Sequence, residues 1–189
     1  MDAVKTVLEQ DGPEALSART VGKVAGYSYA TIYNYYRDFN HLLWHVSLEY
    51  RDDLAAYLKA QHDCLKEQFS AGDLLREMFT AHAAFFLERP NVYTFLFAHP
   101  IGEIPDDLRE RMADTALRSI LWEQLHELET GQEGSPDAIR TMADVLVTMV
   151  HGLLVLYFSG KRPMAAAELV AQVRANVAFV VELYVKKEG

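Results

Sequence analysis

Two histidines and one glutamate, His41, His45 and Glu49, follow one another at intervals of four residues. On an α-helix this spacing places the three side chains on one face, where imidazole and carboxylate groups could bind a metal ion. A protein zinc site uses several ligands in a tetrahedral arrangement, and a single helix lacks the contribution of another segment. We therefore expect no metal ligands and no cofactor.

The rest of the sequence shows no pattern typical of catalysis. We find no nucleophile motif and no glycine-rich loop that would cradle phosphate groups. We expect no catalytic residues and no enzymatic activity.

Residues 26–36, GYSYATIYNYY, contain five tyrosines and no charged side chain. Ile32, Tyr33 and Tyr36 lie three to four residues apart, which indicates a short helix rather than a strand. The residues that face away from Ile32 and Tyr36 are polar, aromatic or small, and they suit hydrogen bonds and close approach to DNA. This set comprises Tyr29, Ala30, Thr31, Asn34 and Tyr35.

A second short helix precedes this stretch. Ser17 is a good N-cap for residues 18–26, and Gly26 can end that helix in the left-handed conformation. Two short helices joined by a tight glycine turn are typical of a helix-turn-helix, whose second helix enters the major groove of DNA. Asn34 could bond an adenine edge and Arg19 a guanine, while Lys23 suits phosphate.

The chain of 189 residues is acidic and half apolar, with a formal net charge of −9 and 50% hydrophobic residues. This composition supports one or two domains with a sizeable core. The negative charge repels nucleic acid at long range, so any contact with DNA has to be local. The single Cys64 and the absence of a secretory signal pattern lead us to expect a cytoplasmic protein.

Helical spacing dominates the whole chain, and no strand is expected. We predict an all-α protein of about nine helices, with a helix-turn-helix domain at residues 1–46 and a helical ligand-binding and dimerisation domain at residues 47–189. Residues 145–160 form the longest apolar stretch, which is short for a membrane span, so we predict a buried helix and no membrane. After the first three helices, the predicted helices are 39–68, 74–88, 91–98, 106–129, 137–159 and 164–187.

Residues 12–46, GPEALSARTVGKVAGYSYATIYNYYRDFNHLLWHV, resemble the DNA-binding segment of TetR-type transcriptional regulators. The match runs without a gap, and its most specific part is ATIY after the AGYS turn. The resemblance implies binding to double-stranded operator DNA, a small-molecule effector and a homodimer. It also implies that Tyr33 packs and touches a phosphate. The DNA-binding residues are then Ser17, Arg19, Lys23, Tyr29, Ala30, Thr31, Tyr33, Asn34 and Tyr35, and we expect Tyr27 and Tyr36 to pack the scaffold.

The sequence departs from this family in three ways. Phe39 stands where the family usually has a phosphate-binding lysine, and family members usually carry further residues, often basic, before the first helix. Residues 1–46 contain four Lys or Arg against five Asp or Glu, a net charge of −1. We expect either that residues upstream of Met1 are missing or that DNA binding is weak, with a shallow dependence on salt.

Aromatic residues recur along the helices of the second domain. Most such residues pack in a core, but a set of this size can also enclose an apolar pocket, in which the polar residues are the better ligand candidates. We predict a small apolar or aromatic effector in contact with Tyr57, His82, Phe86, Phe97, Trp122, His126, Met149 and His151. His151 precedes Gly152 in a motif that recurs in the penultimate helix of such regulators, so helix packing in a dimer is the alternative role for His151.

The last two predicted helices, residues 137–159 and 164–187, are apolar on more than one face. A helix that is apolar all round must be buried on all sides, which a monomer of this size does not provide. We therefore predict a homodimer through these two helices, whose two-fold symmetry matches a pseudo-palindromic operator.

These features predict a ligand-responsive transcriptional regulator, a repressor that a small apolar or aromatic ligand releases from its operator. The alternative is a small-molecule or partner-binding helical protein with an impaired DNA-binding unit.

Overall fold

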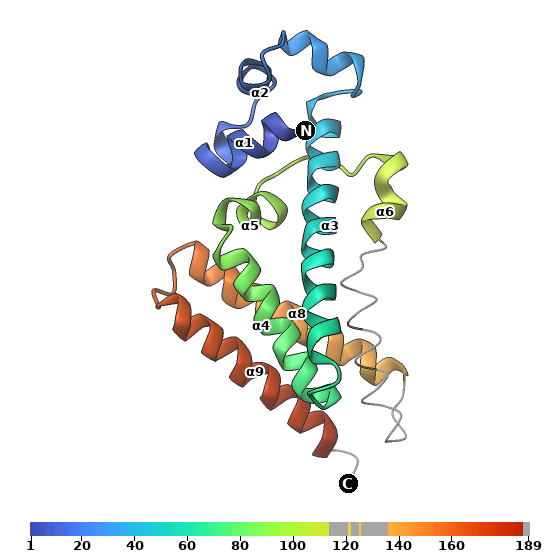
Figure 1. The fold of residues 1–189 in the computed structure, drawn as a ribbon, viewed down its shortest axis with the longest axis vertical. Helices are drawn as coiled ribbons and strands as arrows, with labels where there is room; N and C mark the ends of the chain where they lie inside the picture. The colour runs from blue at the N-terminus through green and yellow to red at the C-terminus, as the bar shows by residue number, and fades with distance from the viewer. Residues whose placement is uncertain (114–120, 122–124, 126–135, 187–189) are drawn as a thin grey trace. The chain divides into compact units, whose positions relative to one another are not determined.

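A computed structural model of the protein describes residues 1–113, 121, 125 and 136–186. Every regular element in this part of the chain is an α-helix or a 3-10 helix, and the described residues contain no strand (Figure 1). The prediction of an all-α fold is confirmed. The predicted helix 106–129 begins as η3 (Asp106–Leu108) and α6 (Arg109–Ala113), and most of its remainder lies outside the described residues.

The chain divides into two compact units. The first contains Met1–Asp53 and Glu88–Thr115, and the second contains Leu54–Leu87 and Ala116–Gly189. Helix α3 (Phe39–Leu65) supplies residues to both units. The expected domain boundary after residue 46 falls within this helix and stays a prediction.

The first unit is built around α1 and the beginning of α3. Val4, Val7 and Leu8 are at most 1% exposed, as their helical spacing predicts. Two hydrogen bonds hold the end of α1, since the Asn91 amide donates to the Glu9 carbonyl and the Tyr50 hydroxyl donates to the Glu9 carboxylate. Besides the beginning of α3, the elements of this unit are α1 (Asp2–Asp11), η1 (Pro13–Ala15), α2 (Ala18–Ala25), η2 (Tyr29–Asn34), α5 (Pro90–Phe97), η3 and α6.

The second unit packs three helices, α4 (Ala71–Leu87), α8 (Pro136–Phe158) and α9 (Ala166–Lys186), together with the end of α3. Buried residues recur every four positions on α8 and α9, which is the period of one helix face. These fully buried residues are Leu146, Val150 and Leu154 on α8 and Leu169, Val173 and Val177 on α9.

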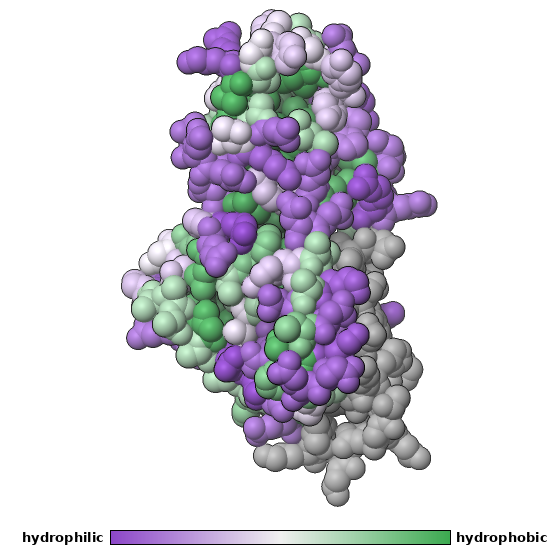
Figure 2. Space-filling model, in the orientation of Figure 1, coloured by the Kyte–Doolittle hydropathy of each residue, from purple (hydrophilic) through white to green (hydrophobic). Residues whose placement is uncertain are grey.

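Helix α8 differs from the prediction that residues 145–160 form a buried helix. Only 28% of its apolar window, Arg140–Phe158, is buried within this chain, because one face packs inward and the other is open. Among the described residues this is the one helix that could cross a membrane by length and composition alone, a test that core helices of soluble proteins also pass. Apolar side chains also lie on the surface along α9 (Figure 2). The large exposed apolar residues of the two helices are Val145, Val155, Leu156, Phe179 and Leu183.

Candidate DNA-reading surface and effector site

Helix α2 begins at a side-chain cap. The Ser17 hydroxyl accepts a hydrogen bond from the Thr20 backbone N–H at 3.1 Å, so the predicted N-cap is confirmed. Arg19 and Lys23 lie one turn apart on this helix and are both exposed. Neither forms an ion pair with any residue that the structure describes. Both cations are therefore open to a phosphate or a base.

The turn after α2 depends on two glycines. Gly26 has φ +72 and ends the helix in the left-handed conformation, as predicted. Gly22 faces the next element, since a Cβ atom at Gly22 would lie 3.1 Å from the Tyr27 carbonyl oxygen and from the Tyr29 backbone. The small residue at position 22 lets the tyrosine-rich segment pack directly against α2.

The predicted recognition helix is a 3-10 helix, η2, rather than an α-helix. Its backbone bonds include Thr31 N–H to the Ser28 carbonyl at 2.9 Å, and the Ser28 hydroxyl accepts the Ala30 N–H at 3.3 Å. Short helices are marginal, and the tyrosine, threonine and isoleucine residues here have modest helix propensity, which favours the tighter form. The prediction of a short helix and not a strand is confirmed, and the structure shows that this helix is of the 3-10 type.

The tyrosines of this stretch are open to solvent. Tyr29 is 55% exposed, Tyr33 49% and Tyr35 78%. Ala30 and Asn34 are also exposed, and Thr31 is half-buried. Their assignment to DNA contacts stays a prediction, and it requires this exposure.

Two tyrosines were expected to pack the scaffold. Tyr36 is half-buried, and its ring meets the rings of His41 and His45 edge-on. Tyr27 is 70% exposed, so the expectation that it packs is wrong. The Tyr27 backbone stays against α2, since its N–H donates to the Gly22 carbonyl at 3.0 Å, and it is the side chain that remains in solvent.

Asp38 directly precedes α3, and its carboxylate accepts the His41 backbone N–H at 2.7 Å. This hydrogen bond is the main reason why the pKa of Asp38 lies below its ordinary value. Arg37 lies against the same carboxylate at 3.3 Å, and Phe39 is the first residue of the helix. A side-chain cap therefore anchors α3 directly after the tyrosine-rich segment.

Acidic partners neutralise part of the positive charge near this surface. Lys5 pairs with Glu49 at 3.3 Å and with Asp53 at 3.4 Å. Since Arg37 is paired with Asp38, Arg19 and Lys23 are the unpaired Lys and Arg residues among residues 1–46, all of which are described.

The structure brings together several predicted effector residues in the second unit. An uninterrupted series of ring contacts runs from α8 through α4 to α3. The contacts are His151–His82 at 5.2 Å, His82–Phe86 at 5.1 Å, Phe86–Phe85 at 5.2 Å and Phe85–Tyr57 at 5.5 Å between ring centroids. Sequence reasoning did not select Phe85, the ring that joins Phe86 to Tyr57.

His82 is an unusual member of this series. It is 3% exposed, and its Nδ1 atom has no hydrogen-bond partner among the residues that the structure describes. Burial, followed by the charge of His151, lowers the pKa of His82 to about 3, so its imidazole is neutral at neutral pH. A buried polar atom without a partner costs about 1–3 kcal/mol, and such atoms call for an explanation such as a role in ligand binding.

The other predicted effector residues do not join this series. Met149 is half-buried on α8, and Phe97 belongs to the first unit, where it is 39% exposed. Trp122 and His126 lie outside the described residues.

Arg51 was missed by sequence reasoning. Its guanidinium lies 5.8 Å from the Phe97 ring centroid, and burial lowers its pKa. Its Nε atom is buried and has no hydrogen-bond partner in the described part of the chain. The one sequence signal was a cation on the apolar helix of residues 39–68, which by itself does not distinguish a buried arginine from a surface one.

Comparison with known proteins establishes the fold. No protein-family model and no curated protein matches the chain. The transcriptional regulator FadR from Bacillus subtilis, solved in complex with stearoyl-CoA, superposes with a TM-score of 0.68 at 15% identity over 94% of this chain and 95% of its own. The TetR-family transcriptional regulator PfmR from Thermus thermophilus gives 0.63 at 21% identity, over 95% and 94% of the two chains.

A protein of unknown function from Rhodococcus sp. RHA1 gives a TM-score of 0.70 at 22% identity, over 94% of this chain and 90% of its own. The chain thus has the fold of TetR-family transcriptional regulators, as the resemblance of residues 12–46 implied.

Proposed function

We propose that this protein is a ligand-responsive transcriptional regulator of the TetR type, a cytoplasmic repressor that binds operator DNA as a homodimer. The observation that carries the proposal is the surface formed by α2 and η2. Its tyrosines are exposed, its two free cations are on α2, and its turn packs η2 against α2. Neutral hydroxyl and amide groups suit contacts with base edges, and the cations suit phosphate.

A matched pair of arginine variants tests this surface. Arg19→Ala should weaken binding to DNA from the region flanking the gene by about 1–3 kcal/mol if Arg19 contacts a base. Arg109→Ala removes the same charge from an exposed arginine that pairs with Asp106, and we expect no effect on DNA affinity. Equal losses of DNA affinity in both variants would show that Arg19 acts only through its positive charge and not through contact with a base.

The effector site is proposed for the second unit, around His82 and the ring series. The rings would give such a site an apolar lining, and the His82 Nδ1 atom, which has no hydrogen-bond partner among the described residues, would supply one polar contact. A small apolar or aromatic compound fits this chemistry. One protein of this fold was solved with stearoyl-CoA, whose acyl chain is apolar, so stearoyl-CoA and an aromatic dye are suitable probes.

In the proposed response to the effector, helix α3 couples ligand binding to DNA binding. This continuous helix carries Tyr57 of the ring series and, at its other end, the Asp38 cap that follows η2. A ligand that shifts α3 would change the spacing of the two DNA-binding units in a dimer and release the operator. Because coupling is reciprocal, operator DNA should weaken ligand binding by the same factor, and equal ligand affinity with and without DNA would contradict the mechanism.

The dimer is proposed to form through the outer faces of α8 and α9. Val145, Val155 and Leu156 on α8 and Phe179 and Leu183 on α9 are 38–62% exposed. Exposed apolar residues on two adjacent helices are typical of an interface with another copy.

One observation favours a second function, a small-molecule or partner-binding protein that uses the helix-turn-helix only as a scaffold. Two of the four cations in residues 1–46 are held by acidic partners. DNA binding should then be absent even at low salt, whereas the regulator shows a specific complex that weakens as salt rises.

A further inference from the structure

We propose that His41, His45 and Asp107 form a binding site for a divalent transition-metal ion, with zinc as the ion that suits this ligand set. The three residues belong to the first unit and are described in full. They offer two imidazoles and one carboxylate, a combination that zinc sites with three protein ligands use with water in the fourth position.

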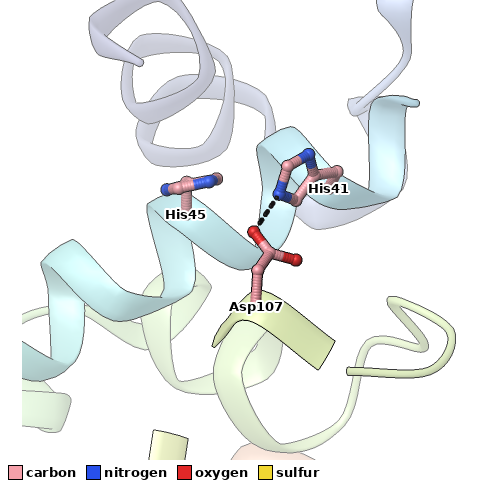
Figure 3. A group of neighbouring side chains, drawn as sticks. All are labelled: His41, His45 and Asp107. Carbon is pink, nitrogen blue, oxygen red and sulfur yellow. Dashed lines mark hydrogen bonds and ion pairs between the residues drawn. The ribbon is translucent and has the colours of Figure 1, made fainter. Parts of the chain in front are cut away.

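The geometry brings the ligands from two separate segments. His41 and His45 project from successive turns of α3, and Asp107 reaches them from η3 (Figure 3). The three candidate ligand atoms lie within 4.8 Å of one another. This arrangement supplies what the sequence alone lacked, namely a ligand from a second segment.

The distance between two of the three ligand atoms is close to that of a loaded site. The His41 Nε2 atom is 3.1 Å from the Asp107 Oδ2 atom, while two ligands of a tetrahedral zinc with bonds of about 2.0–2.1 Å are about 3.3 Å apart. The His41 and His45 rings are 4.8 Å apart between centroids. Loading requires a rotation of the side chains, and the Asp107 side chain, 60% exposed, has room for it.

Glu49 is not the third ligand. Although it shares the helix face with both histidines, its carboxylate pairs with Lys5 at 3.3 Å. Tyr36 covers the histidines from another side, with its ring 5.4 Å from the His45 ring. The site is thus closed by an aromatic ring on one side and open beside Asp107.

Metal binding has a structural consequence for the segment before α3. The His41 Nδ1 atom accepts a hydrogen bond from the Arg37 backbone N–H at 3.2 Å, and Nε2 faces Asp107. A neutral imidazole that binds a metal through Nε2 carries its proton on Nδ1, where it can no longer accept a hydrogen bond. Loading therefore breaks the bond to Arg37, two residues after Tyr35.

The first experiment measures metal binding without DNA. The purified chain of 189 residues is titrated with Zn²⁺ against a chromophoric chelator, and with Co²⁺ for the visible absorption of a tetrahedral site. Asp107→Asn and His45→Gln should each weaken Zn²⁺ binding at least about tenfold. Circular dichroism and thermal unfolding verify that each variant is folded.

Two neighbouring substitutions serve as matched controls. Asp106→Asn removes a carboxylate one residue away that pairs with Arg109, and Glu49→Gln removes the one on the histidine face. Both should leave Zn²⁺ affinity unchanged. The proposal is overturned if the wild-type protein binds no Zn²⁺ or if Asp107→Asn binds Zn²⁺ as tightly as wild type does. It is also overturned if Glu49→Gln weakens Zn²⁺ binding as much as Asp107→Asn does.

The second experiment tests the consequence at Arg37 and rests on the proposed DNA-binding function. Zn²⁺ should change the affinity for operator DNA in wild type and not in Asp107→Asn. Zn²⁺ binding without any effect on DNA affinity would support the site and overturn its link to η2. Failure of wild type to bind DNA would count against the proposed function alone, since the metal titration is independent of DNA.

Discussion

Gly22 lies so close to Tyr29 that a Cβ atom at position 22 would stand 3.1 Å from the Tyr29 Cα atom. The contact is between backbones, so it sets how η2 rests on α2. No side-chain rotation can relieve crowding there, and the chain itself must move.

The first prediction concerns this contact. Gly22→Ala gains about 1 kcal/mol of helix propensity, but its methyl group pushes the turn and η2 away by a few tenths of an ångström. We expect little net change in thermal stability and a loss of DNA affinity equal to about one base contact, roughly 1–3 kcal/mol, measured by fluorescence anisotropy. Val24→Ala, an exposed position on the same helix, is the control and should change neither quantity. Unchanged DNA affinity in Gly22→Ala would show that the turn absorbs the methyl group.

The second prediction concerns the cap of α3. Asp38→Ala should lower the free energy of unfolding by about 1 kcal/mol, because the His41 N–H loses its acceptor. The pKa of Asp38 is lowered in the folded state, so its charged form stabilises the protein above the ordinary value of about 4 and this contribution is lost as the pH falls through the folded pKa. Chemical denaturation at a series of pH values measures this dependence.

The control for the cap is Asp38→Asn. Asparagine also accepts the His41 N–H but does not titrate in this range, so most of the stability should remain while the pH dependence of this site disappears. If Asn and Ala reduce stability equally, then the charge of Asp38 and not its hydrogen bond is what matters.

The third prediction concerns His82. His82→Leu removes a buried polar atom that has no partner, so we expect the free energy of unfolding to rise by about 1 kcal/mol. The same change should weaken binding of anilinonaphthalene sulfonate or stearoyl-CoA, followed by fluorescence titration. Opposite effects on stability and on affinity are the signature of a polar group kept for ligand binding. His62→Leu, another buried histidine of the second unit, should leave probe affinity unchanged.

The fourth prediction concerns the open face of α9. Phe179 is 62% exposed, so Phe179→Asp should leave the fold of the chain intact. It should weaken the homodimer by at least about 2 kcal/mol, since a buried aromatic residue at an interface is replaced by a charge. Sedimentation equilibrium measures the change, and Val24→Asp, at an apolar position that is 48% exposed on α2, is the control. A dimer that persists in Phe179→Asp would place the interface elsewhere.

The sequence predicts the helices well because their ends are local. Ser17 caps α2 by accepting a hydrogen bond from the N–H of Thr20, three residues on, and Gly26 ends the same helix through its own φ. The sequence did not predict whether η2 is an α-helix or a 3-10 helix, because the same short segment can form either and its packing decides between them. The exposure of Tyr27 likewise depends on the direction of the turn and not on its composition.

The amino-acid sequence by itself determined the all-helical architecture and the tyrosine-rich segment, since caps, glycine turns and helical periodicity act over a few residues. Only the tertiary structure decided which distant side chains meet. Asp107 reaches His41 across 66 positions of sequence, and His151 meets His82 from a separate helix. Such pairs are set by how whole helices pack, and helix packing depends on every buried face at once. The same packing leaves the His82 Nδ1 atom without a hydrogen-bond partner among the described residues, which no spacing in the sequence could reveal.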